Sequence, residues 1–324
     1  MTLTVAAAQY APVFLDKAAT LDKLEQVARE ASAQGVELLV FPETFVPAYP
    51  DWVWRAKPWD RDSQDLYARL LEESVAVPGP DADRLGRVAR ENGLWLVVGV
   101  NERVGSTLCN TLLWFAPDGS LAHLHRKLMP TGGERLVHGY GDGSTLRVLE
   151  APIGRLGGLI CWENYMPLAR AALYDQGIEV YVAPTWDTSD VWVPTLQHIA
   201  KEGRCFVIGA CQAIRGADIP ADVPARGLWQ DDEWLARGLS AIVAPGGSVI
   251  AGPLEEKEGL VIATIDVTAA ARGRMTFDPT GHYARPDVLS LRVDTTPRAP
   301  VRFGAVSGPV SGPEHGEPAK PPTP

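Results

Sequence analysis

The chain has 324 residues, and 46% of them are hydrophobic, which is enough for a packed core in one large domain or two ordinary ones. The formal net charge of −10 argues against nucleic-acid binding, because such a surface needs clustered Lys and Arg. No apolar run approaches the roughly 20 residues of a membrane span, and the N-terminus lacks the basic start of a secretory leader. The four cysteines show no pairing pattern, which favours a reducing compartment. We therefore expect a cytoplasmic protein that binds neither nucleic acid nor a membrane.

In the first half of the chain, apolar runs that predict strands alternate with segments whose apolar residues have helical spacing. A strand is predicted at 3–10, followed by a helix at 16–34 that carries its apolar residues on one side and ends at Gly35. The next predicted elements, in chain order, are a buried strand at 36–43, a helix at 81–92, a strand at 94–103 and two strands within 108–127 that are joined at Pro117-Asp118-Gly119.

The second half adds further hairpins and helices. It predicts a hairpin within 144–161, a helix at 166–176, a strand at 178–186, a helix at 194–203, a strand at 205–214, a hairpin within 240–254 and a closing strand at 259–267. This mixture favours an α/β fold in which helices cover the sheets over a purely parallel, doubly wound sheet. No composition break precedes residue 297, so we expect one domain at 1–296 and a Pro/Gly-rich tail at 297–324 that is disordered or lies on a partner surface.

Reactive side chains follow several of these apolar strands. Glu43 ends "LLVFPE", Lys127 ends "LHRK" with Glu134 in the glycine-rich loop after it, and Cys161 ends "GGLIC". Strand ends from distant parts of the sequence can meet in one cleft. A thiol of pKa about 8.5 needs activation at neutral pH, which a neighbouring carboxylate provides as general base. A lysine ammonium would then stabilise developing negative charge, so the set contains what acyl transfer requires.

Each of these residues also has a purely structural interpretation. A lone buried cysteine is usually a packing residue, a lone strand-end lysine is usually solvated, and either glutamate could cap a loop or a helix. Glu163, beside the nucleophile's turn, is best explained by a structural hydrogen bond that fixes the turn. His123 and His125 alternate on one strand without a third ligand nearby, so a packed or solvated face is favoured and no metal site is predicted.

The stretches "FPETFVPAYP", "RKLMPTGGER", "GYGDG" and "CWEN" resemble the nitrilase branch of the carbon–nitrogen hydrolase superfamily. Amidase and carbamoylase branches usually follow the cysteine with a Tyr-Asp type of dipeptide. The resemblance covers roughly residues 4–293 and includes "HIAKEGRCFVIGACQ" and "GHYARPDV". It implies a four-layer α-β-β-α sandwich and a nitrilase that converts a small organic nitrile to the acid and ammonia through a cysteine thioimidate and thioester, with some amide product.

The same resemblance assigns roles to individual residues. Glu43 is the expected base, Lys127 the stabiliser, Cys161 the nucleophile and Glu134 a second carboxylate that holds the lysine. No cofactor or metal is implied.

Three more residues are expected at the substrate. Trp162 and Trp186 are candidate pocket walls, and His138, which stands where nitrilases commonly carry Trp, is expected to border the substrate.

Two alternative functions stay open. An amidase or N-carbamoyl hydrolase of the same superfamily would use the same residues on another substrate, and a non-catalytic assembly scaffold would use only the fold. The resemblance also implies a homo-oligomer, a dimer or a larger and possibly spiral assembly formed through the helices of the sandwich.

Overall fold

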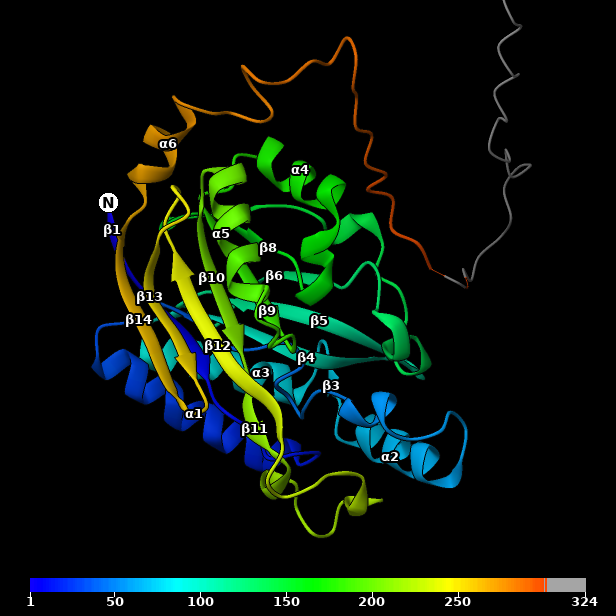
Figure 1. Cartoon of the computed structure of the whole chain (residues 1–324). Coiled ribbons are helices and arrows are strands. Elements are labelled where there is room, and N and C mark those ends of the chain that lie inside the picture. The colour runs from blue at the N-terminus through cyan, green and yellow to red at the C-terminus, as the bar shows by residue number, and fades with distance from the viewer. Residues whose placement is uncertain (300, 302–324) are drawn as a thin grey trace, which may run out of the picture.

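The computed structural model describes residues 1–299 and 301, and two seven-stranded sheets form its centre (Figure 1). The first sheet has the order β14 (Gly259–Asp266), β1 (Thr2–Gln9), β2 (Leu38–Val40), β4 (Trp95–Val104), β5 (Thr107–Phe115) and β6 (Leu121–Arg126), with β3 (Val75–Ala76) beside β4. The second has the order β11 (Ala213–Arg215), β12 (Trp234–Val243), β10 (Phe206–Cys211), β9 (Val180–Thr185), β8 (Gly154–Gly158) and β7 (Leu149–Ala151), with β13 (Val249–Glu255) beside β12.

Alternation along the strands sends side chains to two different cores. In β1, Val5 and Ala7 belong to the core between the sheets, whereas Ala6 and Ala8 belong to the core beneath the helices. This period of two is what a strand imposes, and it makes both faces of each sheet apolar. Each sheet therefore needs a second sheet on one face and helices on the other.

Helices cover the two outer faces (Figure 1). Helices α1 (Lys17–Ala33) and α3 (Pro80–Asn92) share one core with the first sheet, and α4 (Pro167–Asp175) and α5 (Trp192–Gly203) share another with the second. The result is the four-layer α-β-β-α sandwich, so the predicted fold class is confirmed. Among the described residues, no helix is both long and apolar enough to cross a membrane.

The strands combine parallel and antiparallel pairs, as the mixed sequence pattern predicted. Strands β1, β2 and β4 run parallel, and so do β8, β9 and β10, while β4 with β5 and β12 with β13 form antiparallel pairs. Parallel neighbours bring their carboxyl ends to one edge of the sheet. The segments after β2, β8 and β9 are the ones that carry Glu43, Cys161 and Trp186.

Two helices were not predicted from the sequence. Helix α2 (Arg61–Glu72) buries Leu66 and Leu70, which lie four residues apart on one face of a largely polar segment. Helix α6 (Thr268–Arg274) is seven residues long and buries only Ala270.

The described chain beyond Arg274 forms no further helix or strand. It returns to the body of the protein, where the Arg298 N–H donates to Asp142 Oδ2 at 2.6 Å. The predicted tail at 297–324 lies outside the described residues, apart from 297–299 and 301, so the domain boundary stays a prediction.

Candidate active site

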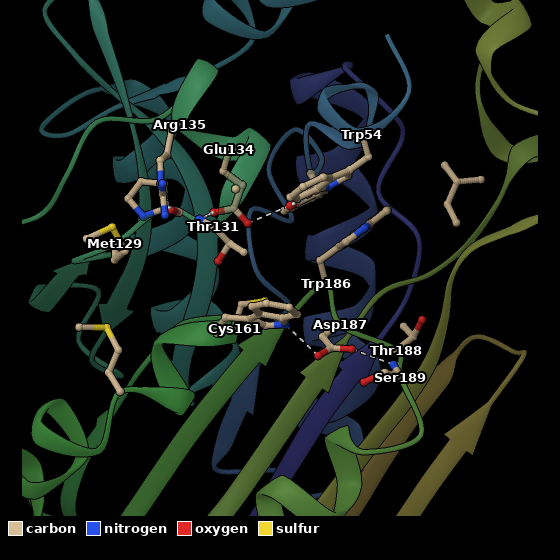
Figure 2. A pocket seen from close by; sticks show the side chains of 16 residues that line it. Trp54, Met129, Thr131, Glu134, Arg135, Cys161, Trp186, Asp187, Thr188 and Ser189 are labelled. Atoms are coloured by element: carbon tan, nitrogen blue, oxygen red, sulfur yellow. Dashed lines mark hydrogen bonds between the residues drawn. The ribbon is translucent and has the colours of Figure 1, made fainter. Parts of the chain in front are cut away.

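A pocket of about 790 Å³ opens at the strand ends and has Cys161 in its wall (Figure 2). Figure 2 shows Glu134 and Thr131 on one side of the thiol and Trp186 and Asp187 on the other. Four aromatic and two thioether side chains contribute to the lining, which consists of Tyr49, Trp54, Met129, Pro130, Thr131, Gly132, Glu134, Arg135, Cys161, Trp162, Met166, Trp186, Asp187, Thr188, Ser189 and Leu235.

Cys161 stands on a sharp turn between β8 and the 3₁₀ helix Cys161–Tyr165. Its φ of 52° lies in the left-handed region, which is strained for a residue with a Cβ. Asn164 supports the turn, because its Nδ2 donates to the Leu159 and Cys161 carbonyl oxygens at 3.0 and 2.8 Å. The strained backbone thus places the Cys161 side chain in the pocket lining, although the residue is only 4% exposed.

The ammonium of Lys127 joins the two carboxylates predicted for the site. Its Nζ donates to Glu43 Oε1 at 2.7 Å and to Glu134 Oε2 at 2.8 Å, and all three side chains are almost completely buried. Buried charges are tolerated when they are paired and hydrogen-bonded, and this arrangement meets that condition. Residues 84 and 7 positions apart from Lys127 in the sequence therefore meet in one chain of ionic hydrogen bonds.

Neutral donors hold the two carboxylates in place. Glu43 accepts from Asn110 Nδ2 at 2.8 Å and from the Trp186 N–H at 2.8 Å. Glu134 accepts from the Tyr49 hydroxyl at 2.8 Å and from the N–H of Thr131 at 2.9 Å. Each carboxylate is thereby fixed from two directions besides the lysine.

Burial and neighbouring charge shift the ionisation of the group. Burial raises the pKa of the Cys161 thiol well above its usual range, and the Glu43 carboxylate raises it further against the opposing effect of Lys127. Burial also raises the pKa of Glu43, although Lys127 opposes this.

Glu134 behaves differently from Glu43. Burial would raise the pKa of Glu134, but Lys127 and the Thr131 N–H outweigh burial and lower it. These shifts favour a neutral thiol and an ionised Glu134 beside the lysine, and they make Glu43 easier to protonate than Glu134.

Both tryptophans expected at the pocket lie in its wall. Trp186 stacks on Tyr49 with ring centroids 4.6 Å apart and planes at 11°. Trp162 is half exposed, and its indole Nε1 donates to Asp187 Oδ2 at 2.9 Å. The two indoles follow the ends of the neighbouring strands β8 and β9, so the edge of the second sheet positions both of them in the pocket wall.

His138 is placed differently from the sequence expectation. It is buried outside the pocket lining, where its Nε2 pairs with Asn101 Oδ1 at 2.8 Å and its N–H donates to the Glu134 carbonyl oxygen at 2.7 Å. Burial lowers the pKa of His138 to about 4, so the ring is neutral at pH 7. The side chain supports the segment that carries Glu134 and is not among the residues that line the pocket, so the structure does not bring it to the substrate-binding position expected from the sequence.

Sequence reasoning missed several residues that complete the site. Asn110 lies inside β5 and Tyr49 in a loop, and neither has a sequence signal that distinguishes it from an ordinary buried polar residue. Only the pairing of the first sheet brings Asn110 beside Glu43. Among the described residues, no group of three or more His, Cys, Asp and Glu is arranged to hold a metal ion.

The sandwich and the carboxylates, lysine and thiol at its strand ends together define a class of cysteine-dependent hydrolases. Residues 4–274 match the carbon-nitrogen hydrolase family. The chain is 46% identical over 299 residues to an aliphatic nitrilase of Sinorhizobium fredii (strain HH103), covering 91% of this chain and 97% of the relative. It is 45% identical over 311 residues to nitrilase 1 of Arabidopsis thaliana, with coverages of 93% and 90%.

A bifunctional nitrilase/nitrile hydratase of Lupinus angustifolius is 42% identical over 315 residues, which cover 94% of this chain and 90% of that protein. Among solved structures, the C. elegans NitFhit protein superposes with a TM-score of 0.72 at 20% identity, over 90% of this chain and 67% of that one. A carbon-nitrogen hydrolase from Helicobacter pylori G27 gives a TM-score of 0.71 at 18% identity, with coverages of 89% and 97%; at these identities the likeness concerns the fold. The chain belongs to the carbon–nitrogen hydrolase family, within its nitrilase branch.

Proposed function

We propose that this protein is a nitrilase that hydrolyses a small organic nitrile to the carboxylic acid and ammonia. The observation that carries the proposal is the buried Glu43–Lys127–Glu134 chain beside the strained Cys161 thiol. In this proposal Cys161 is the nucleophile, Glu43 the general base and acid, Lys127 the electrostatic stabiliser, and Glu134 the carboxylate that holds Lys127 in place. The curated relatives named as nitrilases, at 45–46% identity, support the same substrate class.

The first step forms a carbon–sulfur bond. Glu43 takes the thiol proton, the Cys161 sulfur adds to the nitrile carbon, and the nitrogen receives the proton back from Glu43, which leaves a thioimidate. A neutral thiol beside a carboxylate with a raised pKa suits this exchange, because a carboxylate of raised pKa is a stronger base.

The next steps consume two waters. Glu43 activates the first water, which adds to the thioimidate carbon, and Lys127 offsets the charge of the tetrahedral species. The Trp162 N–H, near the start of a 3₁₀ helix, is a second donor to that charge. Loss of ammonia gives a thioester, and a second water releases the acid and restores the thiol. Over the whole cycle, one nitrile and two waters give one acid and one ammonia.

The tetrahedral species can also expel sulfur in place of ammonia. The carbon–sulfur bond then breaks with its electron pair on sulfur, Cys161 regains a proton, and an amide leaves after only one water has reacted. This branch needs no additional residue, so we propose a minor amide product. The lupin relative is named as both a nitrilase and a nitrile hydratase, which supports this branch.

Parallel assays with nitriles and with their matching amides test the proposal. Aliphatic, aryl and arylacetonitriles should release ammonia, and intact-mass spectrometry should show an acyl adduct that is absent in Cys161→Ala. Ammonia from the amides alone would replace the nitrilase assignment with an amidase or N-carbamoyl hydrolase. An absence of both ammonia and adduct would favour the assembly scaffold.

The chain is also proposed to form a homo-oligomer through α4 and α5. Leu168, at the start of α4, and Val191, just before α5, are 66% and 60% exposed, so both apolar side chains are available to a second copy of the chain. Light scattering should give a multiple of the chain mass, and a mass near 35.0 kDa would contradict the proposal. Truncation after residue 296 should leave activity intact and change only the size of the assembly.

A further inference from the structure

Glu163 is a buried carboxylate that does not line the pocket and takes no part in the chemistry proposed above. Its side chain is fully enclosed, and it accepts hydrogen bonds from three donors. These are the N–H of Leu128 at 2.6 Å, the N–H of Ile160 at 2.8 Å and the His125 ring Nε2 at 3.2 Å. Every donor adjoins a strand end that carries a proposed catalytic residue.

The donors come from both sheets. Leu128 immediately follows Lys127 at the end of β6, in the first sheet, and His125 belongs to β6 itself. Ile160 immediately precedes Cys161, at the end of β8 in the second sheet. The two oxygens of Glu163 therefore cross the seam between the sheets and join the backbone after the lysine to the backbone before the nucleophile.

A role confined to the nucleophile's own turn does not account for these contacts. Asn164 already holds that turn through the carbonyl oxygens of Leu159 and Cys161, and Tyr181 fixes Asn164 with a hydroxyl bond of 2.7 Å to Oδ1. If Glu163 only supported the turn as well, its bond from the Ile160 N–H would be sufficient. The bonds to Leu128 and His125 point to the other sheet and have no function within the turn.

His125 has a partner at each ring nitrogen. Its Nε2 donates to Glu163 at 3.2 Å, and its Nδ1 lies 3.4 Å from the Thr145 hydroxyl oxygen. The ring is thus held from two sides and presents a fixed donor to Glu163. Three fixed donors hold the Glu163 carboxylate in one position, whereas an ion pair between flexible side chains at the surface would not.

Building on the proposed function, we propose that Glu163 is a positioning residue that sets the separation of the Lys127 ammonium and the Cys161 sulfur. Lys127 is held at its ammonium by Glu43 and Glu134, and its neighbouring peptide is held by Glu163. Loss of the Glu163 bonds frees the β6 end to move relative to β8. A misplacement of about 1 Å in an active site lowers turnover by about 100-fold.

Glu163→Gln tests the proposal, because an amide keeps the size of the side chain but turns one acceptor into a donor that faces another donor. We expect kcat on a nitrile to fall about 10-fold to 100-fold while KM changes less than about twofold, since the pocket wall is untouched. The rate at which iodoacetamide alkylates Cys161 at neutral pH, followed by intact mass, should fall about 10-fold. A KM that rises with kcat unchanged would overturn the proposal.

Glu102→Gln is the matched control. Glu102 is equally buried, but its donors, Thr111 and Arg126, lie within the first sheet and do not cross to the second. Both variants should lose thermal stability, and only Glu163→Gln should lose alkylation rate. Equal alkylation rates in the two variants would show that Glu163 is merely structural.

A second variant keeps the test decisive if Glu163→Gln does not fold. Glu163→Asp keeps the charge but is one methylene shorter, so it cannot reach both strand ends, and it should slow alkylation in the same direction. An unchanged rate would overturn the proposal. Alkylation requires no nitrile. If the wild-type protein is inactive on nitriles but Glu163→Gln still slows alkylation, the proposed function is wrong and the positioning role of Glu163 stands.

Discussion

Removing the buried ammonium with Lys127→Met gives the sharpest test of the site's electrostatics. In the native protein two carboxylates share one lysine at 2.7 and 2.8 Å, so the buried group has a net charge of −1 when all three are ionised. The substitution leaves Glu43 and Glu134 facing each other without a cation. Breaking a buried ion pair by removing one partner destabilises a protein by about 3–5 kcal/mol, and we expect that loss at pH 8.

The pH dependence of this loss has a definite sign. The folded pKa of Glu134 lies below its ordinary value, with Lys127 as the main lowering influence, so its stabilisation is present above the unfolded pKa and is lost as pH falls. Without Lys127 that pKa rises, and protonation relieves the repulsion. The difference in free energy of unfolding between wild type and Lys127→Met should therefore be largest near pH 8 and shrink towards pH 4.5.

Urea denaturation followed by circular dichroism, at pH 8 and at pH 5, measures both quantities. The double variant Lys127→Met/Glu134→Gln carries one buried charge fewer and should recover about 1–3 kcal/mol. Lys23→Met is the control: Lys23 pairs with Glu258 at the surface, where such pairs contribute less than about 1 kcal/mol. A loss below about 1 kcal/mol for Lys127→Met, or an equal loss at both pH values, would refute the electrostatic reasoning.

Three further outcomes are expected. Burial lowers the pKa of His138 from 6.5 to about 4, so stability from its neutral form is present above pH 6.5 and lost as pH falls to about 4; His138→Gln should abolish this pH-dependent loss of unfolding free energy, which amounts to about 3 kcal/mol between pH 6.5 and pH 4. A variant whose urea midpoint falls with pH as steeply as that of the wild type would contradict this. Trp162→Phe removes the N–H to Asp187 and should raise KM for an arylacetonitrile about twofold to fivefold, but not for a small aliphatic nitrile. Cys161→Gly should be more stable than Cys161→Ala by about 1 kcal/mol in denaturant titrations, because glycine accepts a φ of 52° without strain; the reverse order would disprove the strain.

The core of the fold was predictable because its signals are local. In α1 the buried residues Leu21, Leu24 and Val27 are spaced as on one side of a helix, and the strands of both sheets are continuous apolar runs. Helix α2 was not predicted, although its buried Leu66 and Leu70 have helical spacing in a largely polar segment. Its position depends on packing against the rest of the protein, which no local window contains.

The site divides in the same way. Glu43, Lys127 and Cys161 could be proposed from the sequence because each follows an apolar strand within a recognisable motif, and Glu134 because it lies in the glycine-rich loop after Lys127. The expectation for His138 was wrong about its place, since burial behind Glu134 depends on how the loop after Lys127 folds back on the first sheet. A motif gives the neighbours of a residue along the chain and not the direction of its side chain.

The amino-acid order alone indicated an α/β fold in which helices cover the sheets, and the residue types that can do its chemistry, because alternation and strand ends are properties of short segments; the four-layer arrangement was implied by the family resemblance. Only the tertiary structure decided which of those residues touch. The strand order places Asn110 beside Glu43, the meeting of two sheets lets Glu163 join Leu128 to Ile160, and the loop after β9 brings Asp187 to an indole. Such contacts join segments far apart in sequence, and their distances are fixed by the packing of whole layers.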